Sequence, residues 1–104
     1  MPEVAPAVIS PQGELDLHNS PVVKEQLESL IGEQRPKVVV DLSDVSYIDS
    51  SGLAVFIEAM QRIMGYGGSF VICGLQENVR NIFSIARLDQ VFRIFPDQSA
   101  ALSA

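Results

Sequence analysis

Apolar residues along the chain occur in two alternating patterns, short continuous runs and repeats spaced by three or four positions. Continuous runs, typical of strands buried on both faces, occupy residues 7–10, 37–42, 69–73 and 91–95. Between them, apolar residues recur with the period of an amphipathic helix. This alternation predicts strands connected by helices, and therefore a largely parallel or mixed sheet.

Caps, prolines and glycines mark where the predicted helices begin and end. The first helix begins at Asn19-Ser20-Pro21, since either polar residue can cap and proline suits the first turn, and it ends near Gly32. The other helices are predicted over residues 51–64, over residues 77–86 and after a capping Asp97. Residues 13–16 and 41–49 are predicted to turn the chain. The core-facing stripe of the second helix is predicted to be Leu53, Phe56, Ile57, Met60, Ile63 and Met64.

The length and composition favour a single folded domain. With 104 residues, 47% of them hydrophobic and 19% charged, the chain can bury about 65% of its unfolded surface. We expect one α/β domain over residues 1–104, with a core at about 7–102 and a short N-terminal segment at 1–6. Its mixed sheet should have about four strands, with a short extra edge strand as a variant, and about four helices.

The charge and the apolar runs exclude several kinds of partner. The net charge is −6, whereas binding to a nucleic-acid backbone needs clustered Lys and Arg. No apolar run approaches 18 residues, and the N-terminus lacks the pattern of a signal peptide. We therefore expect a cytoplasmic protein that binds neither nucleic acid nor membrane.

Residues suited to catalysis or metal binding are few. His18 is the only histidine, Cys73 is the only cysteine, and no phosphate-binding glycine loop is present. Asp41, Asp44 and Asp49 match no established calcium-loop spacing. We expect no enzymatic activity, no metal and no cofactor, and we expect Cys73 to be a buried structural thiol.

The segment Asp49-Ser50-Ser51-Gly52 has more polar residues than a helix start requires. One of them suffices as a cap, and a glycine lets the backbone come close to a neighbouring segment. Gly52 in the first turn nevertheless costs up to about 1 kcal/mol relative to alanine. A local rule that is broken without an evident gain often marks a functional site. Ser50 and Ser51 are therefore candidate functional residues.

This segment also carries a family resemblance. VVVDLSDVSYIDSSGL at residues 38–53 resembles the signature stretch of the anti-sigma factor antagonists of the STAS domain family, and Gly-Glu-Leu-Asp at residues 13–16 resembles that family's upstream element. The resemblance extends over residues 7–102. It implies a STAS-like fold in which both segments lie together at one end of the sheet.

The same resemblance implies a function. The family's phospho-acceptor is the serine directly after the aspartate, which is Ser50 here, with Ser51 as the alternative. The unphosphorylated protein would bind a serine-kinase anti-sigma factor and release its sigma factor; phosphorylation would end binding, and a serine phosphatase would restore it. The residues implied at the partner surface are Asp16, Asp49, Ser50, Ser51 and Gly52.

The chain departs from the family pattern at two places, and the oligomeric state and the function each have alternatives. Relatives have about ten more residues before Gly-Glu-Leu-Asp, including a complete edge strand that residues 1–5 can supply only in part, and many have glycine in place of Arg87. A monomer is expected, with a dimer through strand pairing as the alternative. The alternative functions are an adaptor subunit of a transport or signalling complex, and a partner switch acting on a client other than a sigma factor.

Overall fold

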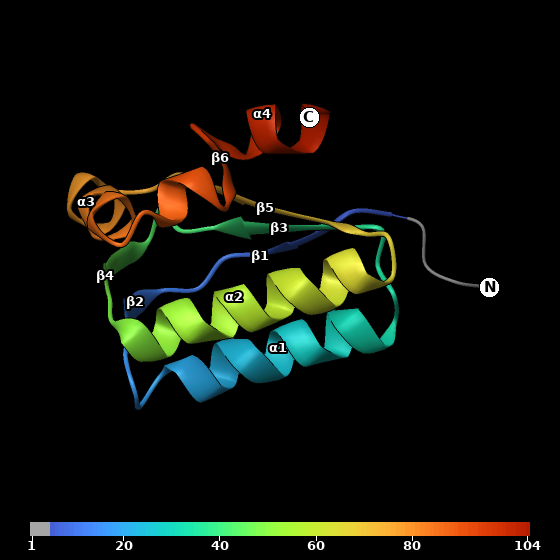
Figure 1. Ribbon diagram of the computed structural model, residues 1–104, viewed down its shortest axis with the longest axis horizontal. Coiled ribbons are helices and arrows are strands. Elements are labelled where there is room, and N and C mark those ends of the chain that lie inside the picture. The colour runs from blue at the N-terminus through green and yellow to red at the C-terminus, as the bar shows by residue number, and fades with distance from the viewer. Residues whose placement is uncertain (1–4) are drawn as a thin grey trace.

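The computed structural model describes residues 5–104, whose strands form two parallel sheets (Figure 1). The main sheet contains β1 (Ala7–Ile9), β3 (Lys37–Asp41), β5 (Ser69–Cys73) and β6 (Arg93–Phe95), in the order β1-β3-β5-β6. A second sheet pairs β2 (Gly13–Leu15) with β4 (Val45–Ile48), and every pair in both sheets is parallel. The helices are α1 (Ser20–Gly32), α2 (Ser50–Gly65), α3 (Glu77–Ile85) and α4 (Gln98–Ser103), with a 3-10 turn at Leu88–Gln90.

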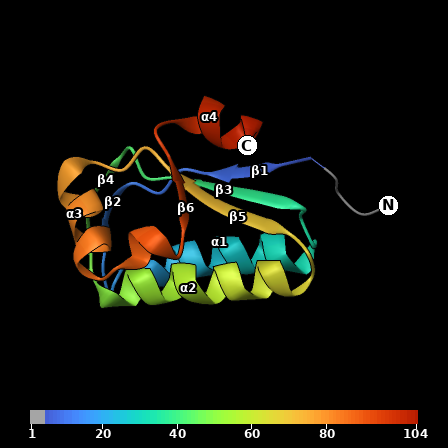
Figure 2. The ribbon, with the colours of Figure 1, turned by 45° about the horizontal axis from the view of Figure 1, so that its top comes forward.

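Helices cover both faces of the main sheet. α1 and α2 lie side by side on one face, and α4 lies on the other (Figures 1 and 2). The central strand β3 is apolar at successive positions because Val38 and Val40 belong to the larger core, whereas Val39 is buried with Ala101 of α4. The predicted α/β fold, with a four-stranded sheet and four helices, is confirmed for the described residues. Within them the sheet is parallel throughout, whereas a mixed sheet was expected.

A row of phenylalanine rings connects α2 to α3 through the larger core. The ring of Phe56 on α2 lies 6.2 Å from that of Phe70 on β5, measured between centroids. Phe70 lies 5.9 Å from Phe92, and Phe92 lies 5.8 Å from Phe83 on α3. Such tilted or edge-on contacts contribute about 0.5–1.5 kcal/mol each beyond the area they bury, so the two helices are linked through the larger core.

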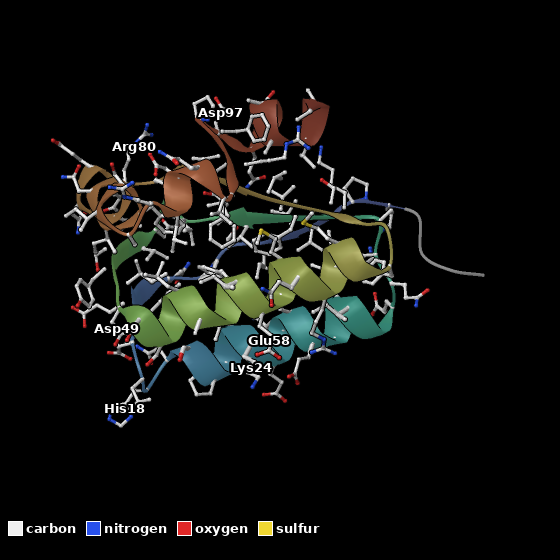
Figure 3. All side chains as sticks on the ribbon, in the orientation of Figure 1. His18, Lys24, Asp49, Glu58, Arg80 and Asp97 are labelled. Carbon is white, nitrogen blue, oxygen red and sulfur yellow. The ribbon has the colours of Figure 1, made fainter. Side chains whose placement is uncertain are left out.

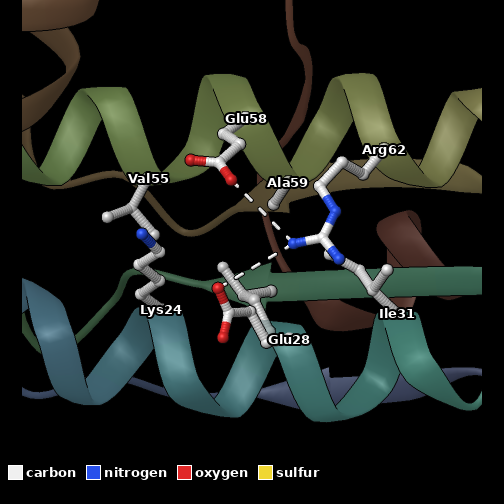
Figure 4. A pocket seen from close by; sticks show the side chains of 8 residues that line it. Lys24, Glu28, Ile31, Val55, Glu58, Ala59 and Arg62 are labelled. Atoms are coloured by element: carbon white, nitrogen blue, oxygen red, sulfur yellow. Dashed lines mark ion pairs between the residues drawn. The ribbon is translucent and has the colours of Figure 1, made fainter.

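The seam between α1 and α2 is apolar inside and ionic at its rim. Leu27 of α1 and Ala59 of α2 are buried along this seam. At the surface, Arg62 lies between two glutamates (Figure 4), with its Nη1 3.8 Å from Glu28 Oε1 and 3.9 Å from Glu58 Oε1. Exposed ion pairs contribute only about 0–1 kcal/mol, so apolar burial holds the helices together.

The short helix α4 is fastened to β3 at both ends. Gln98 Nε2 donates to Asp41 Oδ2 at 2.7 Å, and Lys37 Nζ donates to the carbonyl oxygens of Leu102 and Ala104 at 3.3 and 2.7 Å. Because Lys37 and Asp41 are four positions apart on a strand, both project from the same face of the sheet. Between these two fastenings lies a small cluster of fully buried side chains: Val39, Val71, Cys73 and Ala101.

The second sheet corrects the prediction that residues 13–16 and 41–49 only turn the chain. Both segments contain strands, β2 and β4, that pair with each other. Neither shows the alternation that identifies a half-buried strand, since β2 buries only Leu15 and β4 buries only Val45 and Ile48. The expected extra edge strand falls on residues 1–5, of which only Ala5 is described.

One side chain of α2 differs from the predicted core pattern, and one turn has an unusual backbone conformation. Met64, predicted to face the core, is 62% exposed, whereas Ala59 on the same helix is buried. Arg87 has the left-handed backbone conformation, with φ of +61°, which costs a residue with a Cβ about 1–2 kcal/mol. A glycine would adopt that conformation freely.

Replacing Gln98 with alanine is expected to loosen α4 and make Cys73 react faster. The Cys73 side chain is fully buried with Ala101 of α4, so reagent reaches it only when α4 opens. Burial, together with the charges of Asp41 and Asp97, also raises the pKa of the thiol to about 11. Losing a hydrogen bond to a charged acceptor costs at least about 1.5 kcal/mol. The state in which α4 is open should then be populated about tenfold more, and labelling should be faster by the same factor. The labelling rate under native conditions measures this. The exposed Ser99→Ala is the control, and equal rates in both variants would contradict the fastening.

The contact at Asp41 is also expected to depend on pH. Burial alone raises the pKa of the Asp41 carboxyl, but hydrogen bonds from Gln98 and Ser43 outweigh it and lower the pKa below its ordinary value. Stabilisation from a lowered carboxyl pKa is complete above the unfolded-state pKa of about 3.9 and disappears as the pH falls through the native-state value. Urea unfolding at pH values from about 6 to 2.5 should show a larger loss of stability for the unsubstituted protein than for Asp41→Asn. Parallel losses would exclude this role.

Candidate functional site at the start of α2

The carboxyl ends of β2 and β4 lie side by side, and each strand leads into a helix. Leu15, the last residue of β2, pairs with Ile48, the last residue of β4. The amide of Asp49 donates to the carbonyl oxygen of Leu15 at 3.1 Å. Figure 3 shows Asp49 and His18, from the loop before α1, at the same end of the molecule. Ligands of α/β folds commonly bind beyond the carboxyl ends of parallel strands, so this end is the candidate site.

Asp49 is the N-cap of α2. Its backbone is extended, and its Oδ1 accepts hydrogen bonds from the amides of Ser51 at 2.8 Å and Gly52 at 3.2 Å. Its carbonyl oxygen accepts from the amide of Leu53 at 3.0 Å. A carboxylate here satisfies free amides and interacts favourably with the positive end of the helix. Capping therefore explains why an aspartate precedes the two serines.

Gly52 allows α2 to begin in direct contact with the second sheet. Gly52 is buried, and a Cβ at this position would lie 2.8 Å from both the carbonyl oxygen of Leu15 and Cγ1 of Ile48. These distances are too short for a real contact, so the position requires glycine. Close packing is therefore the gain that offsets the helix cost of Gly52, as the structural interpretation of the sequence expects. A buried glycine also adds no side chain to a partner-binding surface.

The two serines differ in exposure. Ser50 is exposed at the first position of α2, and Ser51 is half-buried. No hydrogen bond of the Ser50 hydroxyl to another residue of the described range 5–104 is present. An exposed hydroxyl on a fixed helix end is open to a modifying enzyme, and Ser50 meets that requirement better than Ser51.

Asp16 shapes the loop between β2 and α1. Its Oδ1 accepts from the amides of His18 and Asn19, both at 2.9 Å, and its carbonyl oxygen accepts from the amide of Ser20 at 2.8 Å. The side chain of Asn19 donates to the carbonyl oxygen of Glu14 at 2.9 Å. Asn19 is the N-cap residue of α1, but neither it nor Ser20 caps through its side chain as the sequence suggests. The loop is thus fixed by its own polar groups.

The surface around Ser50 combines negative charge with exposed apolar groups. Glu14 is exposed, and Asp16 and Asp49 are half-buried. None of the three forms an ion pair within the described part of the chain. Tyr47, which pairs with Glu14 across the strands, is 44% exposed, and Leu17 is 77% exposed. The sequence prediction omits Leu17 and Tyr47, because their exposure depends on the loop and on an unpredicted strand.

The remaining acidic residues do not converge. Asp41 accepts hydrogen bonds from Gln98 and from the amide of Ser43, whereas Asp49 caps α2. In the described range, no group of three or more His, Cys, Asp or Glu side chains could hold a metal ion. No helix in that range is long and apolar enough to cross a membrane. That the chain uses no metal or cofactor stays a prediction.

Comparison with known proteins identifies a family match over most of the chain. The family model of the STAS domain matches residues 2–101. The anti-sigma-B factor antagonist of Bacillus subtilis is 37% identical over 82 residues, covering 79% of this chain and 74% of that protein. The anti-sigma-B factor antagonist of Listeria monocytogenes is 34% identical over 82 residues, covering 79% of this chain and 72% of that protein.

A solved structure extends the similarity to the whole fold. The Thermotoga maritima protein TM1081 has 27% sequence identity and a TM-score of 0.83, covering 97% of this chain and 89% of that one. The arrangement of strands and helices that brings Asp16 and Asp49 together therefore belongs to a fold shared with known proteins.

Replacing Gly52 with alanine is expected to destabilise the protein by about 1–3 kcal/mol, the usual cost of overpacking a closed contact. The added methyl group would press on the backbone of Leu15 and on Ile48. Chemical denaturation measures the loss. The matched control is Gly65→Ala at the end of the same helix, where a Cβ meets nothing within 4 Å and stability should rise by up to about 1 kcal/mol. A neutral Gly52→Ala would contradict the packing role.

Proposed function

The chain belongs to the STAS domain family, and on this basis we propose that it is an anti-sigma factor antagonist controlled by phosphorylation of Ser50. The unphosphorylated protein binds a serine-kinase anti-sigma factor, which then releases its sigma factor. The kinase phosphorylates Ser50 to end binding, and a serine phosphatase reverses the modification. The observation that carries the proposal is the exposed Ser50 side chain at the start of α2, beside the loop of Asp16.

The fold should tolerate a phosphate on Ser50. The residue is exposed and at the first helical position, where an anion interacts favourably with the helix end by about 0.3–1 kcal/mol. Asp49 already accepts from the amides of Ser51 and Gly52, which limits that gain. No arginine or lysine pairs with the carboxylates around Ser50 in the described residues. We therefore do not propose that a lysine or arginine of this chain binds the phosphate and rearranges the domain.

The switch acts on the surface that meets the partner. The phosphate adds a charge of about −1.5 to −2 next to Glu14, Asp16 and Asp49. If the partner covers Ser50, that charge is buried without compensation, which costs about 3–5 kcal/mol. Affinity then falls by about 10²- to 10³-fold or more. This repulsive effect exceeds any gain at the helix end, so binding changes while the fold does not.

The proposed partners follow from the same surface. The antagonist binds the kinase through Asp16, Asp49, Ser50 and Ser51, with Gly52 acting beneath them by fixing the helix start. It has no catalytic activity itself and acts as a cytoplasmic monomer.

Incubation with candidate serine kinases and ATP should place phosphate on Ser50, as mapped by mass spectrometry. Ser50→Ala should bind the kinase and remain unmodified, and Ser50→Glu should lose at least about 100-fold in affinity by calorimetry. Ser51→Ala is the matched control and should still be phosphorylated. Phosphate found only on Ser51, or full binding by Ser50→Glu, would overturn the proposal.

A further inference from the structure

Leu17 is the most prominent apolar side chain near Ser50. It is 77% exposed, and it follows Asp16 directly in the loop between β2 and α1. A single exposed leucine is ordinary on a protein surface. This leucine is distinguished by its position, because it lies two residues after Leu15, whose carbonyl oxygen accepts from the amide of Asp49 at the start of α2.

The backbone around Leu17 is fixed on both sides. Asp16 holds the amides of His18 and Asn19 through one carboxylate oxygen, and its carbonyl oxygen holds the amide of Ser20. The Asn19 side chain ties the loop back to Glu14. A side chain presented from such a loop loses little conformational freedom on binding, and rigid apolar groups of this kind are effective anchors at interfaces.

The charges beside Leu17 define the kind of surface that could receive it. Glu14, Asp16 and Asp49 lie around the same strand ends, without ion pairs in the described residues. A complementary partner would present cationic groups around an apolar pocket, because a negative rim would repel these carboxylates. The apolar contact of Leu17 would then contribute to affinity whatever the charge on Ser50, whereas the contribution of the carboxylates would depend on the charge around them.

We propose that Leu17 is a specificity-determining anchor that inserts into an apolar pocket, rimmed by cationic groups, on the kinase that recognises Ser50. The proposal rests on the proposed function and goes beyond it by naming the contact that selects the partner. Phosphorylation of Ser50 decides whether the complex forms, and Leu17 decides with which kinase. A kinase without the pocket would bind this antagonist weakly even when Ser50 is unmodified.

The test measures affinity for the purified kinase that phosphorylates Ser50, using the full unphosphorylated chain and calorimetry. Leu17→Ala should weaken binding by about 10- to 100-fold, the effect of losing a fully buried leucine side chain. Leu17→Met, similar in volume, should stay within about threefold of the unsubstituted protein. Both variants should unfold at the same urea concentration as that protein, because a substitution at so exposed a side chain leaves stability nearly unchanged.

Met64→Ala is the matched control. Met64 is 62% exposed and lies near the other end of α2, about 21 Å from Ser50 at 1.5 Å per residue, so its removal should leave affinity unchanged. Leu17→Ala binding within twofold of the unsubstituted protein, while Ser50 is still phosphorylated, would overturn the anchor and leave the proposed function standing. If the unsubstituted protein bound no kinase that modifies Ser50, both proposals would fail.

Discussion

The close approach of Leu15 to the start of α2 is the contact on which the rest of the site depends. The Asp49 amide bonds to the Leu15 carbonyl oxygen, and Gly52 brings the helix backbone against the same residue. One apolar residue thereby fixes the end of β2, the end of β4 and the first turn of α2. Any shift in this contact would move Ser50 relative to the loop of Asp16, so the rigidity of the surface comes from packing beneath it.

The charges at this end of the molecule explain why the proposed phosphorylation would weaken binding and leave the fold intact. Two helices begin there, and their free amides make the region partly positive. Asp49 and Asp16 each accept two amide hydrogen bonds through a side-chain oxygen. These two carboxylates thus already neutralise much of the positive potential of the helix ends before any modification. A phosphate on Ser50 would find few free backbone amides to accept from. Its charge would therefore act mainly on a bound partner.

The main sheet and its helices were predictable because their signals are local. The run Val38 to Val40 indicates a strand buried on both faces. The start of α1 follows from its proline, and the starts of α2 and α4 follow from capping aspartates. The second sheet was not predictable, since β2 and β4 bury few side chains and are recognisable only through each other. At the site, the sequence indicated that Gly52 allows a close approach of the backbone, but only the structure shows that the contact is with Leu15 and Ile48. Selection of Ser50 over Ser51 came from the family resemblance, and the structure adds its greater exposure.

The position of α4 in the chain has a consequence for synthesis. α4 follows all other elements in the sequence, yet it covers Val39 and Val71 on the two central strands. While the chain is being made, these strands can pair and pack against α1 and α2 before α4 covers their second face. The nascent protein therefore passes through a stage with an apolar stripe open to water, and such surfaces promote aggregation. Premature termination within residues 98–103 would make that stage permanent.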